Sequence, residues 1–302
     1  MTGDPLLVIT GPTAAGKSKL ALEFAERHDG EILSMDSMAV YRRMDVGTAK
    51  PSAEERARVP HHLIDLVEPS ESFDTSRWCA AADAAVAAVR ARGKVPVFVG
   101  GTPLYLMAYF KGLIEGPAAD PALRAELQAR EAREPGSLHA ELARRDPEAA
   151  SRIHRNDAKR LVRALEYVLH TGTAISARQT TFARAGFRVP CRIVALARPR
   201  DELHARVKAR TIAMLGAGLL DEVRAIRDSV GFSRQAAAGI GYRECLDYLA
   251  GRYHDQEELR NRIRRSTHRL IRRQTTWLRR LPEVVWLHPD EGCAALEAAL
   301  LR

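Results

Sequence analysis

The sequence predicts an α/β fold in which a parallel sheet carries helices on both faces and an all-helical segment is inserted into the chain. Short apolar, β-branched runs alternate with amphipathic helical patterns over residues 6–101. A glycine-rich, phosphate-binding pattern joins the first run to the first helix. Strand-like runs then stop after residue 115 and return only at residue 191.

The expected strands are apolar throughout rather than alternating, which is typical of parallel strands that are covered on both faces. Helices are expected between them over residues 18–28 and 77–93, with Gly93 as the C-cap of the second helix. The strands are expected at residues 6–11, 31–35, 62–67, 95–101, 191–197 and 284–287.

The inserted segment is predicted to contain helices and no strand. Asp120 and Pro121 form an N-cap and first-turn pair. Asn156 is expected to cap a later helix that ends near Gly172, and Asp201 to cap a helix of the returning core. The expected domains are an α/β core, residues 1–115 and 187–302, and a helical insertion domain, residues 116–186.

Positive charge is concentrated in two segments of a chain whose net charge is +9. Residues 260–280 hold nine arginines and no acid, and a second basic cluster covers residues 152–163. Such surfaces suit a polyanionic partner, although a solvated helix face without a partner is the alternative. Apolar residues at helical spacing along the longer segment are expected to face the body, and Trp277 and Trp286 are expected in the core. These spaced residues are Leu259, Ile263, Leu270, Trp277 and Leu281.

Composition indicates an ordinary globular protein, since 46% of the residues are hydrophobic and 28% are charged. The sequence shows neither a signal-peptide pattern nor a membrane-spanning run. Its four cysteines are far apart and form no C-x-x-C pair, which predicts reduced thiols and a cytoplasmic location.

The first motif, GPTAAGKS, matches the pattern G-x-x-x-x-G-K-[ST] in full and lies between a strand and a helix. Backbone N–H groups and the positive helix end would surround a phosphate group, and Lys17 adds a cation. Ser18 is a candidate ligand of Mg²⁺. The motif predicts a P-loop NTPase-like core, but it does not say whose phosphate is held. The residues are Gly11, Pro12, Thr13, Ala14, Ala15, Gly16, Lys17 and Ser18.

Two other polar residues follow strands and are expected at the same sheet edge, where open α/β sheets bind ligands. Asp36 fits a general base or a metal contact through water, and equally a helix N-cap in the stretch DSMA. Thr102, in GGTPLYL, offers a hydroxyl, although this turn and the loop 45–51 also fit a purely structural role. The pair His61 and His62 is interpreted as structural.

Taken together, these pieces resemble the tRNA dimethylallyltransferases, also called tRNA isopentenyltransferases. The matching segments run in the family's order over nearly the whole chain. Ala39 and Arg43 stand where many relatives carry Gln and Gly, a departure that leaves the chemistry intact. The segments are GPTAAGKS, DSMAVYRRMDVGTAKP (36–51), PHHLID (60–65), GGTPLYL, NDAKRLVRALE (156–166), GYRECLDYL (241–249) and RRQTTWLRRLP (272–282).

The resemblance implies a prenyl transfer. The loop would hold the diphosphate of dimethylallyl diphosphate, with Mg²⁺ as the cofactor, and the prenyl group would pass to the exocyclic N6 amine of the adenosine just 3′ of the anticodon. A poorly nucleophilic amine needs a nearby carboxylate, for which Asp36 is the candidate. Thr102 would hydrogen-bond in the reaction centre, and Arg210 would face the diphosphate.

The resemblance also implies a tRNA-binding surface that combines core and insertion residues, and the charge of its arginines and lysine suits an RNA backbone. The expected tRNA contacts are Asp36, Ser37, Met38, Ala39, Thr102, Arg124, Lys159, Arg160, Leu161, Val162, Arg163, Arg272 and Arg273.

Three other functions compete with this interpretation. A small-molecule kinase explains the phosphate loop but not the basic helices. An isopentenyltransferase acting on free AMP or ADP shares the chemistry but has little need of tRNA-binding helices. A non-catalytic, nucleotide-gated RNA-binding module leaves Asp36 and Thr102 without roles. The sequence leaves open whether ATP also binds the loop, and it leaves open the oligomeric state, for which a monomer is the working expectation.

Overall fold

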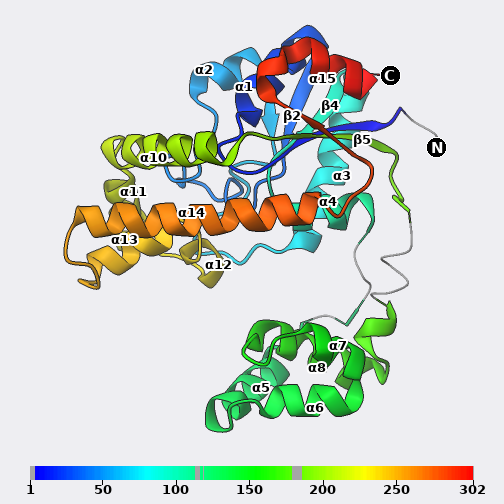
Figure 1. Cartoon of the computed structure of the whole chain (residues 1–302), viewed down its shortest axis with the longest axis vertical. Helices are drawn as coiled ribbons and strands as arrows, with labels where there is room; N and C mark the ends of the chain where they lie inside the picture. Colours follow the sequence, from blue (N-terminus) through cyan, green and yellow to red (C-terminus); the bar gives the residue numbers. More distant parts are fainter. Residues whose placement is uncertain (1–3, 113–115, 118, 179–185, 302) are drawn as a thin grey trace. The chain divides into compact units, whose positions relative to one another are not determined.

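The computed structural model describes residues 4–112, 116–117, 119–178 and 186–301. The chain divides into two compact units, one of Met1–Phe110 with Val189–Arg302 and the other of Lys111–Arg188 (Figure 1). For comparison, the sequence predicts domain boundaries at residues 115/116 and 186/187. The two units are described separately below.

The first unit is built on a single parallel sheet, which confirms the predicted fold class. The described residues form six strands in the order β3-β2-β4-β1-β5-β6, and every pairing between them is parallel. After β1, the chain passes to β2 and then to β3 at one edge of the sheet. It then returns to form β4 between β2 and β1. The strands are β1 Leu6–Thr10, β2 Gly30–Ser34, β3 His61–His62, β4 Val95–Val99, β5 Cys191–Leu196 and β6 Val284–Leu287.

Strand β3 is much shorter than the predicted strand 62–67, so that prediction was wrong in extent. Leu63 and Asp65 have φ angles of +63° and +55°, in the left-handed region that an extended strand does not use. The Asp65 carboxylate accepts hydrogen bonds from Lys50, at 2.6 Å, and from Arg56, at 2.9 Å. These contacts favour a looped conformation over continued strand pairing, and only a bridge between Tyr41 and Val67 remains.

Helices cover both faces of the sheet (Figure 1). On one face, apolar side chains of α1 and α15 meet β-strand residues such as Val97 and Val194. On the other face, Phe98 of β4 lies against Trp78 of α3, whose ring stacks on Tyr105 of α4 at 4.2 Å between centroids. The helices of this unit are α1 Lys17–Arg27, α2 Ala53–Arg58, α3 Thr75–Ala91, α4 Pro103–Phe110, α10 Arg200–Gly216, α11 Leu219–Asp228, α12 Arg234–Ala237, α13 Tyr242–Leu249, α14 Gln256–Leu278, the 3₁₀ turn η1 Pro289–Glu291 and α15 Gly292–Leu301.

The described part of the second unit is helical, as predicted, while residues 179–185 of the expected helical stretch lie outside the described residues. Its helices pack around a small apolar core that includes Leu127, Leu142 and Leu165. Across all described residues, no helix combines the length and the apolar character needed to cross a membrane. The helices of this unit include α5 Pro121–Arg133, α6 Ser137–Arg145, α7 Pro147–Arg152 and α8 Ala158–Thr171, and residues 175–178 are also helical.

Three of the predicted helix starts can be compared with the structure, and one is confirmed. The Asp120 side chain accepts from the N–H of Leu123 and caps α5. Asn156 does not cap α8, because the carboxylate of Asp157 accepts from the N–H of Arg160 instead. Asp201 is not an N-cap either. Helix α10 begins two residues earlier than this cap would place it, at Arg200 after Pro199. Asp201 lies in its first turn, where a negative charge is stabilised by the positive end of the helix.

Candidate active site

Three loops that leave the carboxyl ends of β1, β2 and β4 meet at one edge of the sheet. Asp36 follows β2, and its Oδ1 accepts from the N–H groups of Met38, at 2.8 Å, and Ala39, at 3.3 Å. Asp36 therefore caps a turn and not a helix. Thr102 follows β4, and its hydroxyl accepts from the N–H of Ser37 at 3.1 Å. The sheet thus brings together two predicted reaction-centre residues that are distant in sequence.

The phosphate loop follows β1 and ends at the start of α1, as the motif predicts. Gly11 has a φ angle of +132°, and a Cβ atom on it would lie 2.5 Å from the carbonyl oxygen of Leu196, so only glycine fits here. Lys17 folds across the loop, and its Nζ donates to the carbonyl oxygens of Gly11, at 3.0 Å, and Pro12, at 2.8 Å. Ser18, the candidate metal ligand, is exposed.

The charged groups around the loop lie close enough to shift one another's pKa. Burial lowers the pKa of Lys17 to about 8; the charge of Asp36 works against this shift, and that of Arg210 adds to it. Burial also lowers the pKa of the Arg210 guanidinium, against the effect of Asp36. Two cations thus accompany one carboxylate, which makes the region suited to an anionic ligand.

A cavity of about 290 Å³ connects these residues. The phosphate loop contributes Thr13, and Asp36, Thr102 and Arg210 also line it. Much of the remaining wall is apolar, which suits a ligand that carries a hydrocarbon group beside its charged group. The apolar lining includes Met38, Val207, Met214, Ile240, Ile263 and Leu270.

Of the predicted residues at this site, Ser37 and Met38 are half-buried and line the cavity. The side chain of Ala39 is 6% exposed, so it packs inside the core, while its N–H holds Asp36. The tandem histidines contribute no metal site: His62 pairs with Glu31 of β2, and the described residues contain no cluster of three or more metal-ligating side chains.

Sequence reasoning did not find Glu222, which shapes the loop 45–51. Its carboxylate accepts from the N–H groups of Asp45, Val46 and Gly47, and the hydroxyl of Tyr242 donates to it at 2.6 Å. Glu222 lies on α11, far from the loop 45–51 along the chain but close to it in space, so only the folded structure reveals this role. The loop in turn meets the cavity, since Arg210 donates to the carbonyl of Thr48 at 3.5 Å.

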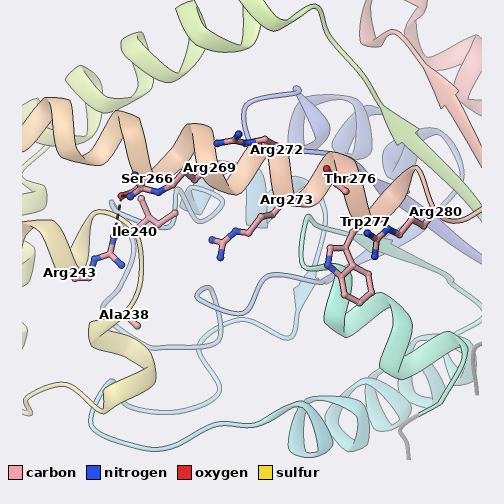
Figure 2. Close-up of a pocket in the computed structure, with 10 residues that line it drawn as sticks. All are labelled: Ala238, Ile240, Arg243, Ser266, Arg269, Arg272, Arg273, Thr276, Trp277 and Arg280. Carbon is pink, nitrogen blue, oxygen red and sulfur yellow. Dashed lines mark hydrogen bonds between the residues drawn. The ribbon is translucent and has the colours of Figure 1, made fainter. Parts of the chain in front are cut away.

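A second cavity, of about 630 Å³, runs along α14 and is called the arginine groove here (Figure 2). It shares Ala238, Ile240 and Arg273 with the first cavity, so the two are adjacent. Five arginines line it, and two of them, Arg243 and Arg269, donate to the hydroxyl of Ser266 at 3.1 Å and 2.8 Å. The lining residues are Ala238, Ile240, Arg243, Ser266, Arg269, Arg272, Arg273, Thr276, Trp277 and Arg280.

The nine arginines of this segment are not equivalent. Arg260 and Arg262 pair with Glu257 and Glu258 in the first turn of α14. In contrast, we find no ion pair for Arg272, Arg273 or Arg280 with any residue that the structure describes. The charge that lacks an ion-pair partner among the described residues therefore lies mainly in the C-terminal half of α14 and just beyond its end, at the arginine groove.

The tryptophan predictions were wrong. Trp277 is 44% exposed and lines the arginine groove, because Leu278, the next residue on the helix, takes the buried position. Trp286 is only partly buried, since it lies in the edge strand β6, which has a neighbour on one side only.

In the second unit, two of the predicted tRNA contacts are held by a buried acid. Arg124 and Arg163 both donate to the fully buried carboxylate of Glu166. Burial by itself would raise the pKa of Glu166, but hydrogen bonds from Arg124, the N–H of Asp120 and Arg163 lower it to about 2. These arginines are therefore fixed in orientation by an ion pair that stays charged at neutral pH.

The stretch 159–163 divides between surface and core. Lys159 and Arg160 are exposed, and Arg160 pairs with Asp157 at 2.6 Å. Leu161 and Val162 are buried in the core of the unit, at 0% and 4% exposure. Their side chains are therefore placed to hold α8 rather than to contact RNA, because α8 turns its apolar stripe inward.

The loop between β1 and α1 of a parallel sheet places the molecule in the phosphate-loop α/β class. The excess of cations over acids around the cavity at this sheet edge suits a phosphorylated ligand. Within that class, a family model described as IPP transferase matches residues 39–281. The chain belongs to this family, which confirms the resemblance seen in the sequence.

Relatives cover nearly the whole chain. A tRNA dimethylallyltransferase of Anaeromyxobacter dehalogenans (strain 2CP-C) is 48% identical over 96% of this chain and 97% of its own length. A crystal structure of the full-length tRNA isopentenylpyrophosphate transferase from Bacillus halodurans is 36% identical, with a TM-score of 0.72 over 98% of this chain and 95% of that one. A eukaryotic dimethylallyltransferase acting on tRNA gives a TM-score of 0.81 at 25% identity, over 98% of this chain and 78% of that one.

We predict that affinity for magnesium pyrophosphate falls as the pH rises through about 8. The charged form of Lys17 binds the anion; it is present below the pKa of about 8 and is lost above it. Arginine stays charged throughout this range, so the affinity of Lys17→Arg changes only with the titration of pyrophosphate. Calorimetry from about pH 7 to about pH 9.5 gives the ratio of the wild-type affinity to the Lys17→Arg affinity, and this ratio reports the titration of Lys17 alone. Lys19→Arg, on the exposed side of α1, is the control. A ratio that does not change with pH would contradict the prediction.

Proposed function

We propose that this protein transfers a dimethylallyl group from dimethylallyl diphosphate to the N6 amine of the adenosine immediately 3′ of the anticodon in tRNA, with release of diphosphate. One observation carries the proposal: the cavity that contains Asp36 and Thr102 is lined by the phosphate loop and also shares residues with the arginine groove. A prenyl donor and an RNA acceptor can therefore reach the same reaction centre. The names of the relatives support the transfer of a dimethylallyl group to tRNA.

In this reaction, the adenine nitrogen attacks C1 of the prenyl group while the bond from C1 to the diphosphate oxygen breaks. Negative charge grows on the diphosphate, where Lys17, Arg210 and the N–H groups of the loop stabilise it. The attacking nitrogen must lose a proton. The Oδ1 of Asp36 is held by two backbone N–H groups, whereas its Oδ2 has no hydrogen bond to any described residue. We assign Oδ2 as the proton acceptor.

Thr102 has a defined part in this scheme. Its hydroxyl oxygen already accepts a hydrogen bond from the N–H of Ser37, so the hydroxyl proton is directed to another acceptor. A lone pair of the adenine ring or a diphosphate oxygen is an acceptor of the right kind. Thr102 is therefore proposed to orient the reacting groups rather than to exchange protons with them.

The residues present fit a Mg²⁺ ion that is held mainly by the substrate. The Ser18 hydroxyl is exposed and makes no hydrogen bond to a described residue, so it is free to serve as a ligand. Mg²⁺ commonly takes its other ligands from phosphate oxygens and water. When bound, the ion would neutralise part of the charge on the leaving diphosphate. Lys17 and Arg210 would stabilise the remainder.

The tRNA is proposed to dock its anticodon stem-loop on the arginine groove, with the target adenine turned out of its stack into the adjacent cavity. Four cations of the groove lack an ion-pair partner among the described residues and suit the RNA backbone. They are Arg269, Arg272, Arg273 and Arg280. Lys159 and Arg160 of the helical unit are further candidates for phosphate contacts.

An acceptor assay tests the proposal against its rivals. The protein is supplied with dimethylallyl diphosphate, Mg²⁺ and either unmodified tRNA or AMP, and prenyl incorporation is followed. We expect product on tRNA alone. Prenylated AMP in place of prenylated tRNA would support a free-nucleotide enzyme, and phosphoryl transfer from ATP would support a kinase.

We predict that Asp36→Asn lowers kcat by about two to four orders of magnitude, the range for loss of a general base. The amide oxygen of asparagine preserves the acceptor for the N–H groups of Met38 and Ala39, so RNA and pyrophosphate should still bind. Single-turnover prenylation measures the effect, and Asp83→Asn, at an exposed site on α3, is the matched control. Turnover within about threefold of wild type would remove Asp36 from the mechanism.

We predict that replacing Arg272 and Arg273 together by glutamine weakens tRNA binding and reduces the slope of log Kd against log salt by about 1 to 2. Fewer counterions are released on binding when a phosphate contact is lost. The salt slope should therefore change together with the affinity. Filter binding over a salt series measures both. Arg252→Gln, at an exposed residue that pairs with Asp247, is the control. An unchanged slope would mean that neither arginine meets a phosphate.

A further inference from the structure

One buried side chain of α14 contacts two of the loops that form the reaction cavity. Gln274 is 6% exposed and follows Arg273 directly along the helix. Its Oε1 accepts from the N–H of Thr13 in the phosphate loop at 2.9 Å. Its Nε2 donates to the carbonyl oxygen of Gly101, next to Thr102, at 2.5 Å. A single carboxamide thus bridges the loops after β1 and β4.

The surroundings are built to fit this carboxamide. A Cβ atom at Gly101 would lie 2.7 Å from Nε2 of Gln274 and 3.1 Å from the carbonyl oxygen of Gly11, so a side chain here would push the loops and the helix apart. The two partners also fix the orientation of the amide group, because a backbone N–H must meet the oxygen and a backbone carbonyl must meet the NH₂.

We propose that Gln274 is a positioning residue, which holds the phosphate loop and the Thr102 loop at their working separation from the same helix that carries the arginine groove. The proposal rests on the proposed function for the roles of Thr102 and Arg273. The N–H of Thr13 lies at the diphosphate side of the reaction, and Gly101 sets the backbone of Thr102. A shift of either loop by about 1 Å is enough to cost up to about 100-fold in rate.

Gln274→Met tests the bridge, because methionine has a similar volume but offers neither hydrogen bond. We expect kcat to fall by roughly 10- to 100-fold. Affinity for magnesium pyrophosphate should fall by about 2- to 10-fold, the effect of one lost hydrogen bond. The Kd for an unmodified anticodon stem-loop RNA, measured without prenyl donor, should stay within about twofold, because Arg272 and Arg273 remain in place. Gln256→Met, at the exposed start of α14, is the matched control.

Gln274→Glu adds a second measurement, the pH dependence of its rate, which a purely structural role of Gln274 would not change. An ionised carboxylate keeps the acceptor for Thr13 but repels the Gly101 carbonyl. A protonated carboxyl donates its O–H to that carbonyl and restores both hydrogen bonds. The rate of Gln274→Glu relative to wild type should therefore rise by about tenfold as the pH is lowered from about 8 to about 6, because burial raises the pKa of a carboxyl group. The rate of Gln274→Met relative to wild type should not change.

The proposal is overturned if Gln274→Met keeps wild-type turnover and pyrophosphate affinity. It is also overturned if RNA affinity falls in parallel with turnover, since that would indicate a general disruption of α14, or if the relative rate of Gln274→Glu is independent of pH. Wild-type protein that transferred no prenyl group to tRNA would instead contradict the proposed function. The pyrophosphate affinities would then still decide whether Gln274 positions the phosphate loop.

Discussion

The structure depends on backbone hydrogen bonds that join the carboxyl ends of three parallel strands. The N–H of Met35 donates to Val99, the N–H of Gly100 to Ile9, and the N–H of Thr102 to Met35. These bonds continue the pairing just beyond the strands, so the loops after β1, β2 and β4 leave the sheet at one edge. The phosphate loop, Asp36 and Thr102 are neighbours for this reason, although they are separated along the chain.

The residues that line the cavity bear on whether a carbon or a phosphorus atom of the substrate is attacked. Kinases and prenyltransferases both need cations around a phosphate, so Lys17 and Arg210 by themselves do not distinguish them. The rest of the wall is informative, because Val207, Met214 and Leu270 offer an apolar lining next to the charged groups. A short hydrocarbon attached to a diphosphate would match both parts, which supports transfer of a carbon group rather than a phosphoryl group.

Neighbouring acids decide which arginines of a basic sequence are held in ion pairs and which remain available to a ligand. Glu166 is fully buried and holds Arg124 and Arg163, whose side chains are 37% and 39% exposed. Removing an arginine would leave the buried carboxylate with fewer partners and is therefore expected to lower stability. A loss of tRNA binding on mutation of these two arginines would therefore have to be separated from a loss of stability. Arg272 and Arg273 have no such partner among the described residues, so their charge is available to a ligand.

The sequence by itself determined the fold class, the phosphate loop, most of the strands and the family, because these depend on local patterns: apolar runs, helical spacing and ordered motifs. It failed where a distant partner decides the outcome. The strand predicted at 62–67 is cut short by the ion pairs of Asp65, and Trp277 faces a groove because Leu278 takes the core position. Likewise, only the folded chain brings Glu222 to the loop 45–51 and Gln274 to the phosphate loop. Buried polar groups need partners, and tertiary structure alone decides which residue supplies them.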